Sequence, residues 1–286
     1  MLFRSAIVRA FSPRRIGLFD PCYSGYERAC GGIEQERFTL SPEDGFCLGE
    51  AACSFVREAD IDMLFLADPN NPTGRLIPPA VKNDILGICL ERGITAVLDE
   101  CFIDLTPRGK TGAADREASD IQPFGGLLRV KAFTKIFAVP GARIGYVVCG
   151  SREAADRIRL ALPEWNLSVF SEAVGIACAE VQKTTDYAAD SLKHNAAERA
   201  RLTECLTGLG FTVFPSDTNF ILIRVPAGSD GLKFLEELAS DRGILLRSCA
   251  NFRGLDSSYI RISVGKPGDN DKLMAAVRGI FARTNA

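Results

Sequence analysis

The sequence of 286 residues contains a single histidine, His194. This excludes mechanisms that need two imidazoles, such as the zinc site of an HExxH motif, and we expect no metal site. The net charge of −2 gives no electrostatic reason to expect nucleic acid or an anionic membrane as a partner. No run of 18 apolar residues is present, so no membrane span is expected. Small molecules and proteins are the expected partners.

The N-terminus lacks a secretory signal, because Arg4 and Arg9 interrupt its apolar stretch. The ten cysteines form no CxxC pair and mostly lie within apolar runs, so we interpret them as reduced core residues of a cytoplasmic protein. Residues 1–15 hold four arginines and no acid, which also resembles an organellar transit peptide. We favour an amphipathic helix there, with these residues facing inward: Leu2, Phe3, Ile7, Val8 and Phe11.

Short apolar runs alternate with helical patterns up to about residue 148, which predicts an α/β fold with a mainly parallel sheet. The expected strands are Ile16–Phe19, Ile33–Thr39, Met63–Ala67, Ala96–Leu98, Leu127–Lys131 and Gly145–Val148. The long helical patterns that follow are 152–162, 169–182 and 187–209. A smaller α+β region is then expected, with strands at 212–214, 219–225, 244–247 and 259–264. We predict a large domain over residues 1–183 and a small C-terminal domain over 184–286, with the boundary near Lys183.

Two segments follow expected strands and carry polar side chains. Asp68-Pro69-Asn70-Asn71-Pro72-Thr73-Gly74 comes directly after one strand, and Asp99 ends the next. The first segment can be simply a stiff turn, but such a turn can also hold the Asn71 amide over the carboxyl end of the sheet, where α/β folds bind ligands. Asp99 follows an apolar run and needs a cationic partner if it is desolvated.

Lys135 lies among apolar residues just after a further expected strand. Desolvation lowers the pKa of a lysine amine and makes it a better nucleophile for a carbonyl, although a lysine can also snorkel at a strand end. Because Asn71, Asp99 and Lys135 each follow a different strand, we expect the fold to bring them to one edge.

The segments DPNNPTG, LDECF and TKIFAVPGARIGY, in this order and at these separations, resemble the fold type I pyridoxal-phosphate enzymes of the class I/II aminotransferase family. The resemblance runs over nearly the whole chain. PCYSGYERA and PEWNLSVFSEA look most like the threonine-phosphate decarboxylases of cobalamin biosynthesis within this family. Histidinol-phosphate aminotransferases are the next most similar group.

The resemblance implies a role for each matching residue. Lys135 forms a Schiff base with the aldehyde of pyridoxal 5′-phosphate and then carries protons, and Asp99 pairs with the pyridinium nitrogen. Asn71 donates a hydrogen bond to the ring hydroxyl oxygen, and Tyr23 stacks on the ring. Thr134 and Arg143 bind the cofactor phosphate, and Arg261 binds the substrate carboxylate. The alternative for Tyr23 is simple packing, and the alternative for Arg261 is a salt bridge to a protein acid.

The sequence departs from the family pattern in two places. A tyrosine usually stands three residues after the aspartate, where this chain has Phe102; the decarboxylase-like branch commonly has phenylalanine there. Family members also carry several dozen residues before the segment that matches Met1, including a glycine-rich turn that cradles the cofactor phosphate. From this we expect either an N-terminally incomplete chain, which we favour, or a natural variant with a weakened cofactor site. In both cases we expect weak cofactor retention and low activity.

Three functions therefore remain open. The first is decarboxylation of a phosphorylated amino acid, L-threonine O-3-phosphate, to carbon dioxide and aminopropanol phosphate. The second is an aminotransferase acting on histidinol phosphate or a related amino acid, and the third is a non-catalytic truncated homologue. The resemblance implies a homodimer. Arg247 and Arg253 are candidates for binding a substrate phosphate, and Asn166 for lining the pocket.

Overall fold

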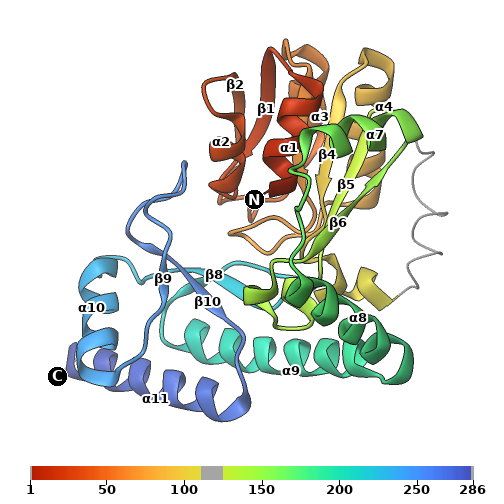
Figure 1. The fold of residues 1–286 in the computed structure, drawn as a ribbon. Coiled ribbons are helices and arrows are strands. Elements are labelled where there is room, and N and C mark those ends of the chain that lie inside the picture. Colours follow the sequence, from red (N-terminus) through yellow and green to blue (C-terminus); the bar gives the residue numbers. More distant parts are fainter. Residues whose placement is uncertain (1, 111–124, 285–286) are drawn as a thin grey trace.

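The computed structural model describes residues 2–110 and 125–284, which form two β-sheets with helices packed around them (Figure 1). The larger sheet has the strand order β2-β1-β3-β4-β5-β6, and the smaller has the order β7-β8-β10-β9. The α/β prediction is confirmed, with a mainly parallel large sheet and a smaller antiparallel one. The domain boundary near Lys183 stays a prediction.

The strands of the large sheet form where short apolar runs occur in the sequence. They are β1 (Arg15–Asp20), β2 (Glu34–Thr39), β3 (Met63–Ala67), β4 (Thr95–Asp99), β5 (Leu127–Ala132) and β6 (Gly145–Cys149). All neighbouring pairs are parallel except β5 and β6, which are antiparallel. The predicted strands of this sheet are confirmed to within one residue at each end.

Helices cover both faces of the large sheet, because alternate strand residues point to opposite sides. Leu64, Leu66 and Leu98 pack with α3 (Glu50–Glu58) and α4 (Pro79–Arg92) on one face. Met63 and Phe65 pack on the other face with α1 (Leu2–Phe11), α2 (Gly25–Cys30) and α7 (Arg152–Ala161). The sequence analysis did not predict α2 or α3. The α1 prediction is correct for Ile7 and Val8, which are buried, whereas Phe3 and Phe11 are half-buried.

The smaller sheet contains β7 (Thr212–Val213), β8 (Phe220–Arg224), β9 (Arg247–Ser248) and β10 (Tyr259–Ser263). Its helices are α9 (Tyr187–Gly208), α10 (Gly231–Arg242) and α11 (Pro267–Thr284), which lie along the lower side in Figure 1. Before them comes α8 (Val169–Thr184). The short helical pieces are α6 (Phe133–Ile136) and the 3-10 turns Ile103–Leu105, Pro107–Lys110 and Pro140–Ala142. Within the described residues, no helix is both long and apolar enough to cross a lipid bilayer.

The strand predicted at 244–247 is wrong for most of its length. Gly243 takes a left-handed conformation, φ +65°, and the Ile244 N–H donates to the Leu238 carbonyl at 3.0 Å. This closing pattern at a helix end keeps Ile244 tied to α10. Strand pairing therefore begins only at Arg247.

The DPNNPTG segment forms a tight turn after β3, and Gly74 makes the turn possible. Gly74 has φ +76°, a Cβ there would lie 2.2 Å from Ser216 Oγ, and its carbonyl accepts from the Asp217 N–H at 2.9 Å. The turn carrying Asn71 is thereby fixed against the loop before β8.

We predict that Gly74→Ala lowers the free energy of unfolding by about 1–3 kcal/mol, because alanine there combines left-handed strain with a steric clash. The measurement is urea unfolding. Gly87→Ala in α4 is the matched control, since its added Cβ would meet no atom within 4 Å, and it should stabilise by about 0.5–1 kcal/mol. Equal stability of Gly74→Ala and the wild type would contradict the prediction.

Candidate active site

Four neighbouring parallel strands of the large sheet end at one edge. Tyr23 follows β1, Asn71 follows β3, Asp99 ends β4 and Lys135 follows β5. β1 and β3 are neighbours in the sheet, but the chain leaves β1 toward β2 on one side and leaves β3 toward β4 on the other. Such a switch point opens a crevice at the carboxyl ends of the strands, where α/β proteins bind ligands.

A cavity of about 560 Å³ lies at this edge. Its wall contains every residue to which the family resemblance gives a role: Tyr23, Asn71, Asp99, Thr134, Lys135, Arg143 and Arg261. Arg261 comes from β10 of the smaller sheet, so both sheets build the wall. The fold thus brings these side chains together, while their individual roles stay predictions.

Asp99 is buried and ionised. Its Oδ2 accepts from the Arg4 Nε at 2.9 Å and from the Tyr26 hydroxyl at 2.8 Å, and its Oδ1 accepts from the Cys101 N–H at 3.1 Å. Burial alone would raise the pKa of this carboxyl, but the Arg4 charge and these hydrogen bonds more than offset it and hold the pKa below its ordinary value. The same site raises the pKa of the Tyr26 hydroxyl, through burial and the nearby carboxylate.

Lys135 lies in α6, directly after β5. Its ammonium is 5.0 Å from the centroid of the Phe102 ring, the residue that departs from the family pattern. Partial burial lowers the pKa of the amine, and the positive charges of Arg261, Arg143 and Arg4 add to this effect. A larger fraction of the amine is therefore neutral, as a nucleophile for a carbonyl requires.

Arg261 and Asn71 are joined by a hydrogen bond. The Arg261 Nη1 donates to the Asn71 Oδ1, and the guanidinium lies 5.0 Å from the Phe220 ring centroid. Because Arg261 takes the amide oxygen, the Asn71 Nδ2 is the donor end that faces a ligand. Burial and the nearby Arg247 lower the pKa of Arg261, so an anion beside it is favoured.

The candidates for binding a substrate phosphate or lining the pocket differ in their position relative to the cavity. Arg247 and Asn166 both line the cavity. Arg253 does not: it lies at the surface and pairs with Glu27 at 3.0 Å.

Sequence reasoning missed two residues at the site, Arg4 and Tyr26. Both touch Asp99 from helices that pack on the sheet face, and neither belongs to a strand-end motif. A signal for Arg4 was present, because it shares a helical face with Ile7, Val8 and Phe11 at spacings of three, four and seven. An arginine within an inward-facing stripe indicates a buried acidic partner.

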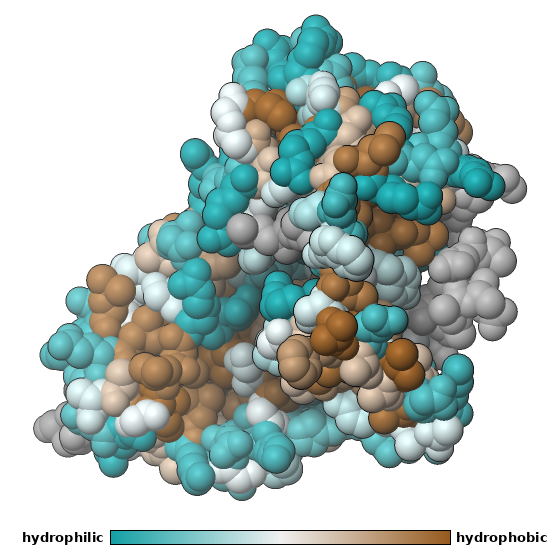
Figure 2. Space-filling view, in the orientation of Figure 1, coloured by the Kyte–Doolittle hydropathy of each residue, from teal (hydrophilic) through white to brown (hydrophobic). Residues whose placement is uncertain are grey.

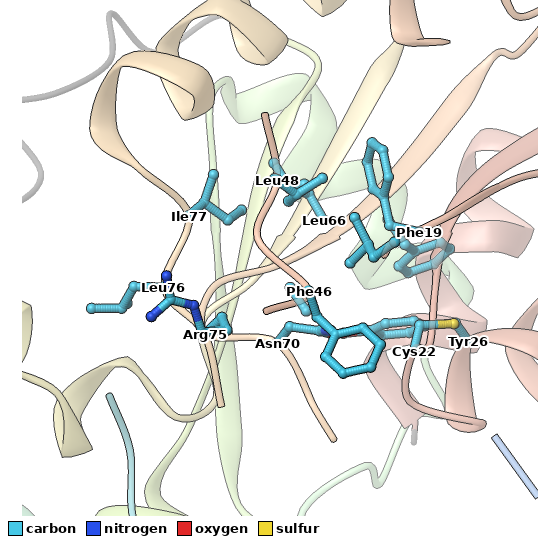
Figure 3. Close-up of a pocket in the computed structure, with 13 residues that line it drawn as sticks. Phe19, Cys22, Tyr26, Phe46, Leu48, Leu66, Asn70, Arg75, Leu76 and Ile77 are labelled. Carbon is cyan, nitrogen blue, oxygen red and sulfur yellow. The ribbon is translucent and has the colours of Figure 1, made fainter. Parts of the chain in front are cut away.

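A second, much smaller cavity of about 20 Å³ lies behind the DPNNPTG turn (Figure 3). Phe46, Leu66 and other apolar side chains line it together with Arg75, whose Nε is buried without a hydrogen-bond partner in the described part of the chain. This volume has room for about one water molecule and none for a cofactor. The 560 Å³ cavity, whose wall holds the residues given roles by the resemblance, is therefore the candidate active site.

Comparison with known proteins identifies the class. Residues 3–277 match the family described as aminotransferase class I and II, and the chain belongs to this family. It is 32% identical to threonine-phosphate decarboxylase from Salmonella typhimurium over 278 residues, which is 96% of this chain and 73% of the relative. It is 33% identical to histidinol-phosphate aminotransferase 3 from Mesorhizobium japonicum, over 77% of this chain and 55% of that protein.

A solved structure supports the same assignment. Histidinol-phosphate aminotransferase from Clostridium acetobutylicum superposes with a TM-score of 0.86 at 29% identity, covering 98% of this chain and 82% of that one. The family and these relatives are enzymes that depend on pyridoxal phosphate. The sequence-based family and cofactor predictions are thus confirmed.

The residues of the cavity fit this cofactor. It needs an amine for its aldehyde, an acid for its ring nitrogen and cations for its phosphate. Lys135 supplies an amine of lowered pKa, Asp99 an ionised carboxylate and Arg143 a guanidinium at the cavity wall. The cavity also contains a cation that the cofactor does not require, because Arg4 forms an ion pair with Asp99.

The pH dependence of stability should report on Asp99. Because its folded-state pKa lies below the unfolded value of about 3.9, its contribution is present above that pH and is lost as the pH falls through the folded-state pKa. Asp99→Asn should lower the free energy of unfolding by about 3–5 kcal/mol at neutral pH, since it leaves Arg4 buried without a counter-charge. In urea unfolding, the difference in free energy of unfolding between the wild type and Asp99→Asn should become smaller below about pH 4.

The exposed Asp84 of α4 provides the control for this series. Asp84→Asn should follow the wild type at every pH. A gap for Asp99→Asn that stays constant down to about pH 3 would show that ionisation of Asp99 does not stabilise the fold.

Proposed function

We propose that this chain catalyses the pyridoxal-phosphate-dependent decarboxylation of a phosphorylated amino acid, L-threonine O-3-phosphate, in cobalamin biosynthesis. The observation that carries the proposal is the charge of the cavity. Lys135, Arg143, Arg247 and Arg261 all line it, and none of them makes an ion pair with a carboxylate within residues 2–110 and 125–284. A cavity with this excess of positive charge suits a ligand with several anionic groups.

Three arginines match three anionic groups of the cofactor and substrate. Arg143 lies close in sequence to Lys135 and is assigned to the cofactor phosphate. Arg261, bonded to Asn71, is assigned to the substrate carboxylate. Arg247 lies on the neighbouring strand β9 and pairs in register with Arg261, which assigns it to the substrate phosphate. Within the described residues its guanidinium donates to the Asn251 Oδ1 at 2.7 Å and pairs with no carboxylate, so its charge is available to a phosphate.

The other side chains prepare the α-carbon for reaction. When bound, the cofactor withdraws electrons from that carbon. Asp99 would hold the protonated ring nitrogen by charge. Lys135 would take a proton from the incoming substrate amine and, after carbon dioxide has left, donate a proton to the α-carbon. Phe102 supplies no hydroxyl at the ring edge, and its ring lies beside the Lys135 ammonium.

The test combines the purified chain with pyridoxal phosphate and threonine phosphate. We expect release of carbon dioxide and aminopropanol phosphate without any oxo-acid acceptor, and a visible absorption band from the Lys135-bound cofactor. Lys135→Ala should abolish the band and lower the rate by roughly a thousandfold or more. Lys233→Ala, on the exposed face of α10, is the matched control and should leave both unchanged.

Other outcomes would identify the alternatives. Turnover of histidinol phosphate that requires an oxo-acid acceptor, with no carbon dioxide, would replace the decarboxylase by the aminotransferase. Absence of the band and of both reactions would indicate a non-catalytic homologue.

We further propose that the active form is a homodimer in a reducing, cytoplasmic setting. All ten cysteines are free thiols, which is typical of reducing compartments.

Large apolar side chains are exposed along α8 and the loop before it: Trp165, Val169, Phe170 and Ile176. In Figure 2, brown side chains gather over this region. Because Asn166 and Leu167 of the same loop line the cavity, a second copy packed there would adjoin the site.

The dimer can be tested by sedimentation velocity. The combined change Trp165→Glu and Phe170→Glu should convert a dimer into a monomer, since buried charges at an apolar interface are costly. Leu90→Glu, an exposed leucine on α4, is the control and should remain dimeric. A wild-type chain that is monomeric at all concentrations would contradict this proposal.

A further inference from the structure

The Arg4 side chain lies inside the candidate active site. It is 11% exposed, and its Nε and Nη2 both donate to the same Asp99 oxygen, with the Nε at 2.9 Å. Its guanidinium also lies 5.2 Å from the centroid of the Tyr23 ring and 5.5 Å from that of Tyr26. Arg4 therefore pairs with a carboxylate while packing on aromatic rings.

These contacts coincide with the two groups proposed for the cofactor ring. Asp99 is the acid assigned to the ring nitrogen, and Tyr23 is the aromatic residue assigned to stacking. A protonated pyridine ring is a flat cation, and a guanidinium is also a flat, delocalised cation. Arg4 thus satisfies the same carboxylate and the same aromatic ring as a bound cofactor ring would.

We infer that Arg4 is an internal competitor for the cofactor ring, so that the cofactor binds only when Arg4 leaves Asp99. This inference rests on the proposed function, because it uses the assigned roles of Asp99 and Tyr23. Arg4 donates to the Asp99 Oδ2. The Arg4 guanidinium and a pyridinium ring cannot both occupy the space beside this buried oxygen.

The structure allows this exchange. Arg4 lines the 560 Å³ cavity, so its long side chain has space to turn away. Asp99 keeps the hydrogen bonds from the Tyr26 hydroxyl and the Cys101 N–H, and the incoming ring replaces the lost positive charge. The apparent affinity for the cofactor is then reduced by the fraction of molecules in which Arg4 holds Asp99.

The experiment measures the dissociation constants of two probes by spectral titration of the whole chain. Pyridoxal phosphate can bond to Lys135, whereas pyridoxamine phosphate has an amine in place of the aldehyde and reports binding without a covalent bond to Lys135. Arg4→Leu should tighten both by roughly tenfold or more, because it leaves the competent state fully populated. Arg4→Lys keeps the charge without the planar fork and should give a smaller gain.

Arg9→Leu is the matched control, because Arg9 belongs to the same helix and bonds the Ala161 carbonyl away from the cavity. It should bind both probes as the wild type does. If Arg4→Leu does not fold without cofactor, the gain in Arg4→Lys carries the test. Unchanged or weaker binding by both Arg4 variants would overturn the inference.

A double variant tests whether Arg4 acts through Asp99. In an Asp99→Asn background, Arg4→Leu should no longer tighten binding of pyridoxamine phosphate, because the shared carboxylate is gone. A gain of the same size in that background would overturn the inference. If neither the wild type nor any variant binds either probe, the proposed function fails too; if the wild type binds and Arg4→Leu binds no more tightly, only the Arg4 inference fails.

Discussion

The buried negative charge of Asp99 is the constraint on which the rest of the site depends. It ends β4 in the interior of the large sheet and is only 5% exposed, so water solvates it poorly. A buried carboxylate stays ionised only with a positive partner and hydrogen bonds to its oxygens. Tyr26 and the Cys101 N–H supply hydrogen bonds, and Arg4 supplies the charge. Any cofactor that binds here must provide an equivalent cation, which explains why a pyridinium ring suits the position.

Much of the fold could be predicted from the sequence because its strands are short, apolar and separated by helical patterns. Where several strands are parallel, their carboxyl ends must meet, so residues that follow them must converge. Asn71, Asp99 and Lys135 were predictable for this reason. The errors occur where the local pattern is weak. The helix α2 was not predicted because it is only six residues long. The apolar run at 244–246 is typical of a strand, but the Ile244 N–H bonds to the end of α10 instead.

The remaining site residues depend on tertiary packing that local sequence does not encode. Arg4 and Tyr26 reach Asp99 from helices whose placement on the sheet face is fixed by the core around Ile7, Met63 and Phe65. Arg247 could be proposed only as one arginine among several. The structure separates it from Arg253 because pairing of β9 with β10 sets Arg247 opposite Arg261, whereas Arg253 lies beyond the strand and reaches Glu27.

The hydrogen bond between Arg261 and Asn71 joins the two parts of the site. Asn71 belongs to the turn after β3 that faces the assigned cofactor ring, and Arg261 belongs to β10 of the smaller sheet. Because Arg261 donates to the Asn71 oxygen, the Nδ2 of the same amide is the end that can donate to another group. In the proposed assignment, substrate and cofactor would meet this one hydrogen-bonded pair, so the position of the smaller sheet against the DPNNPTG turn would matter for binding of both.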